Sequence, residues 1–382
     1  MKQHVLSYLS TIKSEILEIN KSLYKFNEPT FNEFESYNYI ISLLKDHGFC
    51  IENNFNNITS AFRGTIGYGY PEICFICKYS TGSTDGHIFG NNSNATIAIG
   101  SAIGLSSIIN KLSGTIHIIG CPGKYSNGSE IILTKENVFE TSSVIFAPHV
   151  DNSTVLNNFS PACTTLEISY SNNKENPDVN ISCLDFCLHT IHFINQLIQN
   201  TSSDCYMDHL KLYCDNSEND YPTSAKAKFE IKCKSSVICS DIENHIRTYI
   251  NCLKNIMNIS CSINLVELPC NELIDNYVIN KVFENNLKEC GLINVNHNKN
   301  VLYPLSIGNV SHTTPTIYPS INIVDDCNIS CPSIEFKNST ITPFAEKNIW
   351  KAIEALSLTA IDLLERPDLI EESTKSLLKN IK

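Results

Sequence analysis

The N-terminal part of the chain alternates between helical and extended hydrophobic patterns. Apolar residues recur there at three- and four-residue steps, which predicts an amphipathic helix; they are Leu6, Leu9, Ile12, Ile16, Ile19 and Leu23. A second helix is expected over Glu33–His47, ending at Gly48, and a small-residue helix over Ala95–Lys111. Short apolar runs predict strands over Ile58–Gly64, Glu72–Tyr79, Gly114–Gly120 and Ser143–Ala147. Alternating strands and helices indicate an α/β domain whose helices cover a sheet.

The pattern changes after about Pro161. Predicted elements then follow the order β-α-β-β-α-β, over Thr165–Tyr170, Cys183–Gln199, Leu210–Tyr213, Ala225–Lys232, Ser240–Met257 and Ile263–Leu268. That order is typical of a ferredoxin-like α+β unit. A helix over Glu272–Cys290 returns to the first pattern, and helices over Thr342–Leu364 and Pro367–Ile381 complete it. We therefore expect two domains, one over residues 1–162 and 271–382 and one inserted over 163–270.

Composition narrows the class of protein. Of the 382 residues 42% are apolar, which is enough for sizeable cores and excludes a disordered chain. The 28 Lys and Arg against 40 Asp and Glu give a net charge of −12, and only three residues are Arg. A nucleic-acid backbone needs a cationic face, so we expect no nucleic-acid partner. No apolar run approaches the roughly 18–20 residues of a membrane span, so we expect no membrane partner.

Seventeen cysteines are scattered along the chain. Disulfide scaffolds are typical of short secreted chains, whereas this chain is long and its N-terminus shows no apolar signal segment. We therefore expect free thiols and a cytoplasmic location. A zinc site from Cys74 and Cys77 with Cys327 and Cys331 is conceivable. However, the first pair lies on a predicted strand, where a buried thiol is the commoner interpretation.

The segment Lys78–Asn92 carries the most specific motif. Its sequence, K-Y-S-T-G-S-T-D-G-H-I-F-G-N-N, resembles without gaps E-Y-D-A-L-P-x-x-G-H-x-C-G-H-N. That motif is found in zinc amidohydrolases and dipeptidases of the M-twenty metallopeptidase family. The family includes aminobenzoyl-glutamate hydrolase, indole-acetyl-amino-acid hydrolases and aminoacylase-like dipeptidases. Four further segments resemble family motifs in the same order along the chain. Residues 27–33 resemble N-P-E-x-x-F-x-E, and residues 113–122 resemble a strand that leads to P-A-E-E. Residues 147–149 resemble an H-P site, and residues 308–317 resemble G-N-V-S-H-x-x-P-T-I.

This resemblance implies a fold and a cofactor. The implied fold is α/β, a zinc-peptidase-like mixed sheet flanked by helices, with an inserted α+β ferredoxin-like lid or dimerisation domain. Such enzymes hold a pair of zinc ions, and a Glu takes a proton from the metal-bound water. Here the Cys and His ligand positions fall on Phe89 and Asn91. Phenylalanine offers no ligand atom, and an Asn amide is a poor zinc ligand.

The other implied site positions are also altered. The general-base Glu falls on Lys124, whose ammonium group has no lone pair to accept a proton, and the neighbouring Glu ligand falls on Tyr125. The last ligand falls on Pro332, although a shift of one residue would offer Cys331. Only His149 could still ligate a metal, and a hydrogen-bonded core or cleft histidine is the commoner interpretation.

The resemblance also implies positions that contact the substrate. The lid residue that contacts the oxyanion falls near Asn176, which could donate a hydrogen bond, although a loop asparagine is the simpler interpretation. The implied substrate-cleft residues that persist are His87, Asn309, Ser311 and His312. His87 matches a family histidine that is not a ligand, and packing is its simpler role.

Three hypotheses follow. The first is a catalytically degenerate homologue without a cofactor, which binds a peptide-like or acyl-amino-acid ligand and forms a homodimer through the lid or a mixed dimer with an active paralogue. The second is an active amidohydrolase or dipeptidase on N-acyl-amino-acid or dipeptide amide bonds. Its rearranged zinc site would draw on His149, Cys121, Cys331, His87 and Asp85. The third uses Cys121 as a nucleophile and His149 as its base.

Overall fold

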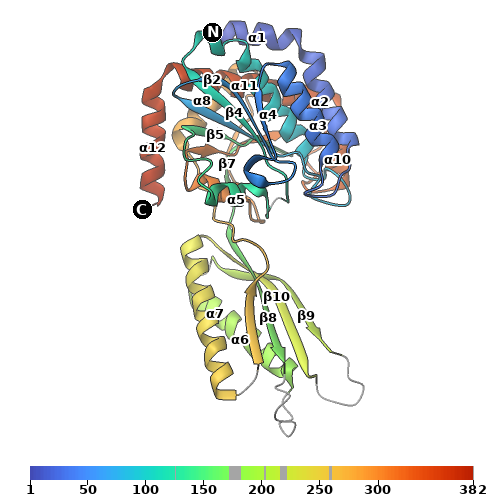
Figure 1. The fold of residues 1–382 in the computed structure, drawn as a ribbon, viewed down its shortest axis with the longest axis vertical. Helices are drawn as coiled ribbons and strands as arrows, with labels where there is room; N and C mark the ends of the chain where they lie inside the picture. Colours follow the sequence, from blue (N-terminus) through green and yellow to red (C-terminus); the bar gives the residue numbers. More distant parts are fainter. Residues whose placement is uncertain (125, 172–181, 202–203, 216–221, 258–259, 382) are drawn as a thin grey trace. The chain divides into compact units, whose positions relative to one another are not determined.

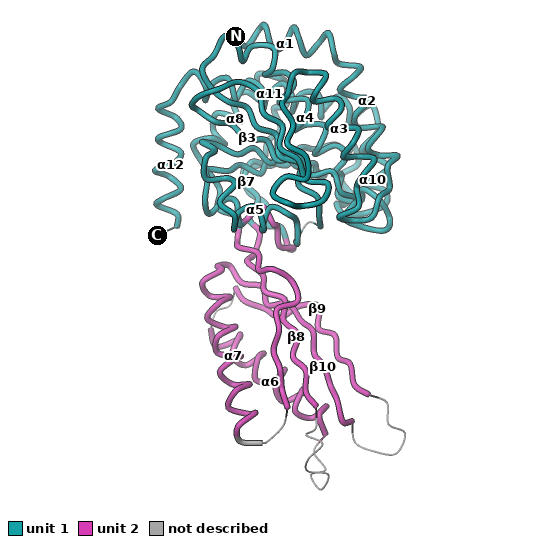
Figure 2. Tube along the Cα trace, in the orientation of Figure 1, with its two compact units in different colours: residues 1–159, 273–301, 309–382 teal, residues 160–272, 302–308 magenta. Residues whose placement is uncertain are grey.

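The computed structural model describes residues 1–124, 126–171, 182–201, 204–215, 222–257 and 260–381 (Figure 1). These residues separate into two compact units, each with its own hydrophobic core. Unit 1 comprises residues 1–159, 273–301 and 309–382, and unit 2 comprises residues 160–272 and 302–308 (Figure 2). In the described parts of the chain, no helix is both long enough and apolar enough to cross a membrane.

A six-stranded mixed sheet forms the centre of unit 1. Its spatial order is β1-β2-β4-β3-β5-β13. The strands are β1 (Cys50–Asn53), β2 (Phe62–Tyr68), β3 (Glu72–Cys77), β4 (Gly114–Gly120), β5 (Val144–Phe146) and β13 (Thr316–Ile317). Strands β4, β3, β5 and β13 pair in parallel, whereas β1 and β2 are antiparallel to their neighbours. Strand β2 starts later than predicted because Asn57 and Ser60 adopt left-handed backbone conformations that interrupt an extended run.

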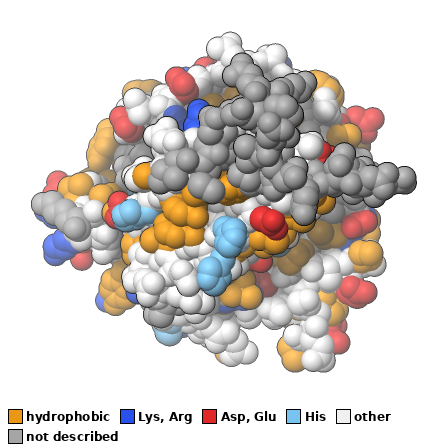
Figure 3. Space-filling view, turned by 90° about the horizontal axis from the view of Figure 1, so that it is seen from below, with side chains coloured by type: hydrophobic (Ala, Val, Ile, Leu, Met, Phe, Trp, Pro, Cys, Tyr) orange, Lys and Arg blue, Asp and Glu red, His pale blue; other side chains and the backbone are white. Residues whose placement is uncertain are grey.

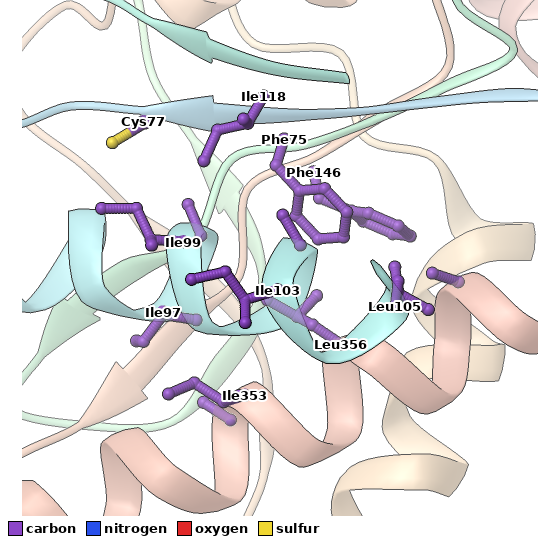
Figure 4. Close-up of a cluster of buried hydrophobic side chains, with 14 of the residues drawn as sticks. Phe75, Cys77, Ile97, Ile99, Ile103, Leu105, Ile118, Phe146, Ile353 and Leu356 are labelled. Atoms are coloured by element: carbon purple, nitrogen blue, oxygen red, sulfur yellow. The ribbon is translucent and has the colours of Figure 1, made fainter. Parts of the chain in front are cut away.

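Helix α4 (Asn91–Ser106) lies at the centre of the unit 1 core. Its residues from Asn91 to Leu105 are all buried. Apolar side chains of α4 lie between the sheet and helix α11 (Pro343–Glu365), with Phe75 and Phe146 of the sheet on one side and Ile353 and Leu356 of α11 on the other (Figure 4). A Cβ at Gly100 would lie 2.8 Å from the side chain of Ile353, so glycine permits this close approach.

The N-terminal helix is broken in two. The continuous helix predicted over residues 6–23 is α1 (Lys2–Thr11) and α2 (Lys13–Lys25), which meet at Ile12. The hydroxyl groups of Ser10 and Thr11 donate hydrogen bonds to the carbonyls of Ser7 and Tyr8. Such back-bonding competes with the helix and bends it. Apart from two helices of unit 2 that are described below, the remaining α-helices are α3 (Phe34–Asp46), α5 (Ser129–Lys135), α8 (Tyr277–Glu289), α9 (Ile307–Ser311), α10 (Ile334–Ser339) and α12 (Pro367–Ile381).

A second, smaller sheet of unit 1 has the order β12-β7-β14-β6. Its strands are β6 (His149–Asp151), β7 (Val155–Phe159), β12 (Asn296–Asn300) and β14 (Ser320–Asn322). Strands β6 and β14 are parallel, as are β7 and β12. The hydrophobic pattern did not predict this sheet.

Unit 2 has the predicted β-α-β-β-α-β order. Its elements are β8 (Ala162–Ser171), α6 (Cys183–Thr201), β9 (Tyr206–Cys214), β10 (Ser224–Cys233), α7 (Ser236–Met257) and β11 (Ser260–Leu265). The four strands are antiparallel in the order β11-β8-β10-β9, and α6 and α7 complete the core. Strand β9 is longer than predicted because a bulge opposite Lys228–Glu230, with His209 at positive φ, breaks its alternating pattern.

Candidate functional site

The predicted site segments follow neighbouring strands of the six-stranded sheet. Lys78 follows β3, Cys121 follows β4, and Ala147 follows β5. Because the carboxyl ends of parallel strands meet at one edge of a sheet, these loops converge there. Open α/β sheets bind ligands at this edge. The candidate site therefore lies within unit 1, where α4 also begins.

An asparagine–histidine network connects two of these segments. His149, 2% exposed, stacks on Tyr318. Nδ2 of Asn94 donates to Nδ1 of His149 (3.3 Å) and to Oδ1 of Asn91 (2.9 Å). Oδ1 of Asn94 accepts a hydrogen bond from the backbone N–H of Val150 (2.8 Å). The Val150 bond fixes the orientation of the Asn94 amide, so its NH₂ group must face the imidazole.

This contact determines which histidine nitrogen carries the proton. An amide NH₂ group has no lone pair to offer, so Nδ1 of His149 accepts and the hydrogen of the neutral ring is on Nε2. A metal-binding histidine has the opposite arrangement, because its second nitrogen donates to a carboxylate or carbonyl. Burial lowers the pKa of His149 to about 4; the carboxylate of Asp151 opposes this shift, and the ammonium groups of Lys299 and Lys78 add to it.

Two lysine–carboxylate pairs contribute charge around His149. Nζ of Lys78 lies 2.7 Å from Oε1 of Glu130, whose side chain is fully buried. Lys299 on β12 pairs with Asp151 on β6, which is also buried. Both ammonium groups lower the pKa of His149, because their positive charge disfavours the charged form of its ring. A cation beside His149 would therefore be repelled by two ammonium groups and attracted by the Asp151 carboxylate.

A second network holds the start of α4 to the β3 and β4 loops. Nδ2 of Asn91 donates to the carbonyl of Ser80 (2.6 Å), and the backbone N–H of Gly123 donates to Oγ of Ser80 (2.9 Å). The Ser80 hydroxyl donates to the carboxylate of Glu33, which is 1% exposed. Asn91 therefore serves as a hydrogen-bonding link, and its oxygen already accepts from Asn94.

The remaining metal positions supply few donors. Phe89 is half-buried, Lys124 is exposed and Pro332 is exposed. The thiol of Cys331 lies 4.0 Å from the carbonyl of Ile88, and burial raises its pKa. Tyr125 and Asn176 lie outside the described residues. The donor set found here does not fit a pair of zinc ions, since among these described positions only His149 carries an imidazole.

The substrate-cleft residues lie in different places. His87 is 1% exposed, and its Nε2 donates to the carbonyls of Leu23 (2.9 Å) and Phe26 (3.3 Å) at the end of α2. Burial lowers the pKa of His87 to about 4. Ser311, at the end of α9, accepts a hydrogen bond from the N–H of Ile274 (2.9 Å). The half-buried side chains are Asn309 and His312.

In the described residues the alternative metal set does not assemble, and the candidate nucleophile is buried. In the described residues, the one group of three metal-ligating side chains within 4.8 Å of one another is Asp208, His209 and Glu230 of unit 2. No three of His149, Cys121, Cys331, His87 and Asp85 therefore converge. Cys121 is fully buried, its thiol lies 3.6 Å from the carbonyl of Ile119, and burial raises its pKa. Such a thiol is a poor nucleophile.

The cysteines are free thiols and form no zinc site in the described residues. Cys74 and Cys77 are buried in β3, whereas Cys327 is exposed. Sequence reasoning missed Asn94 and the pairing of Lys78 with Glu130. The cluster of asparagines at positions 91, 92 and 94 was the available signal for the first.

No protein-family model matches the chain. Two curated proteins align with part of it. One of the subunits of the p-aminobenzoyl-glutamate hydrolase of Escherichia coli is 27% identical over 142 residues, 32% of this chain and 30% of that protein. The Xaa-Arg dipeptidase of Mus musculus is 26% identical over 82 residues, 20% of this chain and 19% of that protein. The alignments thus span less than a third of either relative.

Solved structures resemble the chain over nearly its whole length. A protein from methicillin-resistant Staphylococcus aureus described as an aminohydrolase superimposes with a TM-score of 0.77 at 13% identity, covering 95% of this chain and 100% of that one. The aminobenzoyl-glutamate utilization protein of Klebsiella pneumoniae gives 0.74 at 11%, covering 94% and 98%. A dinuclear metal-binding peptidase of the M-twenty family from Bacillus subtilis gives 0.65 at 13%, covering 92% and 99%. The chain therefore has the fold of the M-twenty peptidases and amidohydrolases, and it resembles that family in sequence.

Proposed function

We propose that the chain is a catalytically degenerate homologue of zinc amidohydrolases and dipeptidases, with a binding or regulatory role. The observation that supports this most is the hydrogen bond from the Asn94 amide to Nδ1 of His149. It leaves the hydrogen of the neutral ring on Nε2, so Nε2 offers no lone pair to a metal. Making that lone pair available requires moving the hydrogen to Nδ1, where it would face the Asn94 NH₂ group.

The surrounding charges support the same proposal. A dinuclear zinc site is built from anionic or imidazole donors, with a carboxylate as general base. This chain has Phe89 and Asn91 at two ligand positions and Lys124 at the base position. Asp151, the carboxylate that acts on His149, is paired with Lys299, and Glu130 is paired with Lys78, whose ammonium group also acts on His149.

A peptide-like or acyl-amino-acid ligand is the natural choice for such a homologue. One curated relative is a subunit of a p-aminobenzoyl-glutamate hydrolase, and the other is an Xaa-Arg dipeptidase; both are named for cleaving amide bonds. On the face in Figure 3, the described Lys and Arg side chains are scattered rather than continuous, which favours a small ligand over a nucleic acid.

The second candidate is an active amidohydrolase or dipeptidase. The resemblance to hydrolases favours it, and it requires a site with about three converging zinc ligands. In the described residues, those ligands would have to move together, because the five candidate side chains do not converge. Replacing His149 by Ala would then abolish hydrolysis. Unchanged hydrolysis in that variant would eliminate this candidate.

The proposed function is tested by assaying the purified full chain for hydrolysis of N-acyl amino acids and dipeptides, with and without added zinc. We expect no zinc-dependent turnover. An active member of the family serves as the positive control for the assay. Zinc-dependent hydrolysis that is lost in a His149→Ala variant would overturn the proposal.

We also propose that the chain assembles through unit 2, as a homodimer or with an active paralogue. Strand β9 is an edge strand of its sheet and exposes Leu210 and Leu212, so it offers unpaired backbone groups and apolar surface. Light scattering on the full chain should give twice the chain mass of 42.7 kDa for a homodimer. A monomer that also fails to capture a paralogue would contradict this. A cytoplasmic location is proposed from the seventeen free thiols.

A further inference from the structure

A pocket of about 380 Å³ lies beside Lys124 in unit 1. Its walls come from three loops that are far apart in the sequence. They are residues 27–30 before α3, residues 81–84 after β3, and Lys124 after β4. The volume falls within the roughly 300–1,000 Å³ of small-molecule sites, near its lower end. The pocket therefore has room for a small organic molecule.

The pocket wall carries several polar side chains. Its hydroxyl and amide residues are Asn27, Thr30, Thr81, Ser83 and Thr84. Hydroxyl and amide groups can donate hydrogen bonds to an anion. The Thr81 hydroxyl already donates to the carbonyl of Glu28 (3.1 Å), whereas among the described residues the other wall hydroxyls donate no hydrogen bond to the protein.

The pocket wall contains one ammonium group and one carboxylate. Lys124 is exposed, and in the described residues no carboxylate lies within salt-bridge distance of its ammonium group. The one carboxylate in the wall belongs to Glu28, and it faces α3. It accepts hydrogen bonds from the N–H of Glu35 (2.6 Å), the N–H of Ser36 (2.9 Å) and the Ser36 hydroxyl (2.7 Å).

A second lysine lies near the 81–84 loop. Nζ of Lys337 donates to the carbonyl of Asp85 (2.8 Å), just beyond the 81–84 loop, and it has no carboxylate partner in the described part of the chain. Lys124 and Lys337, which have no carboxylate partner in the described residues, therefore both lie near the 81–84 loop, in a chain with a net charge of −12.

We propose that this pocket binds a small oxyanion, either the carboxylate of an acyl-amino acid or a phosphate, on the ammonium group of Lys124. The inference rests on the proposed function, because Lys124 stands where an active enzyme of this family would need its base. The backbone of Lys124 is held by Nζ of Lys78, which donates to its carbonyl (3.5 Å). The anion would therefore meet a partly fixed loop, which reduces the entropic cost of binding.

The test is isothermal titration of the full chain with three probes, namely N-benzoylglycine, its neutral amide and inorganic phosphate. We expect at least one anionic probe to bind, and the neutral amide to bind at least about tenfold more weakly than the acid, since a charge-assisted hydrogen bond is lost. Binding of the acid alone identifies a carboxylate ligand, and binding of phosphate alone identifies a phosphate ligand.

The matched variants are Lys124→Gln and Lys135→Gln. Both remove one exposed ammonium group, and Lys135 lies at the end of α5, outside the pocket. We expect Lys124→Gln to weaken anion binding at least about tenfold and Lys135→Gln to leave it unchanged. Equal binding by wild type and Lys124→Gln, or no binding of either anion, overturns the inference. Zinc content and hydrolysis are measured on the same preparation, so zinc-dependent activity would instead overturn the proposed function.

Discussion

Replacing Lys78 by methionine tests the buried ion pair of the candidate site. Methionine keeps an unbranched side chain but removes the ammonium group, which leaves the fully buried Glu130 without its partner. At the observed 2.7 Å and an effective dielectric constant of about 20, the Coulomb attraction is about 6 kcal/mol. Desolvation offsets part of this, and removing one partner of a buried pair costs about 3–5 kcal/mol. We expect the free energy of unfolding of unit 1 to fall by that amount.

The assay is urea unfolding followed by tryptophan fluorescence. The chain has one tryptophan, Trp350, which is buried in α11 and so reports on unit 1. Lys135→Met is the control, because Lys135 is exposed, and it should change stability by less than about 0.5 kcal/mol. The double variant Lys78→Met/Glu130→Gln should recover most of the loss, because neither charge is then left alone. A single variant within about 1 kcal/mol of wild type, or a double variant without recovery, would refute the reasoning.

Three further predictions concern the histidines and the thiols. The Asn94→Asp variant gives Nδ1 of His149 a hydrogen-bond acceptor, so it should raise the pKa of His149 and increase the affinity for zinc. An NMR titration that finds no rise in this pKa would contradict the assigned tautomer. His87 has a folded pKa of about 4, below the unfolded value of about 6.5, so stability should fall on acidification through that window by about 1.4 kcal/mol per pH unit. His87→Gln should remove this contribution, and denaturant melts at pH 7 and 5 that give the same pH dependence in both proteins would count against it. In the native protein a thiol reagent should react first with the exposed cysteines, which are Cys50, Cys214, Cys252 and Cys327. Peptide mapping that finds rapid reaction of a buried thiol such as Cys77 would contradict this prediction.

Hydrophobic periodicity predicted most of the helices and strands, because the main elements are long and amphipathic. The order of unit 2 followed from the apolar patterns of β8, α6, β10 and α7. The sheet β12-β7-β14-β6 escaped prediction because its strands have three to five residues and join distant segments. Strand β9 was only partly found, since a bulge at His209 breaks its alternation.

Part of the candidate site could also be predicted from the sequence, but from residue types rather than from periodicity. The substitutions Phe89, Asn91 and Lys124 can be seen from residue types alone once the motif is aligned. The pairing of Lys78 with Glu130 joins residues that are 52 positions apart, so only the tertiary structure brings them together. The Asn94–His149 contact likewise depends on how α4 packs against β6.

The most direct test of the central claim is the zinc content of the purified full chain. The protein is expressed with excess zinc, desalted, and analysed for metal and protein in the same sample. The account predicts well under one zinc per chain, because the neutral ring of His149 carries its hydrogen on Nε2 and the flanking carboxylates are paired with lysines. A stoichiometry of about two tightly bound zinc ions per chain, as in a dinuclear catalytic site, would contradict it.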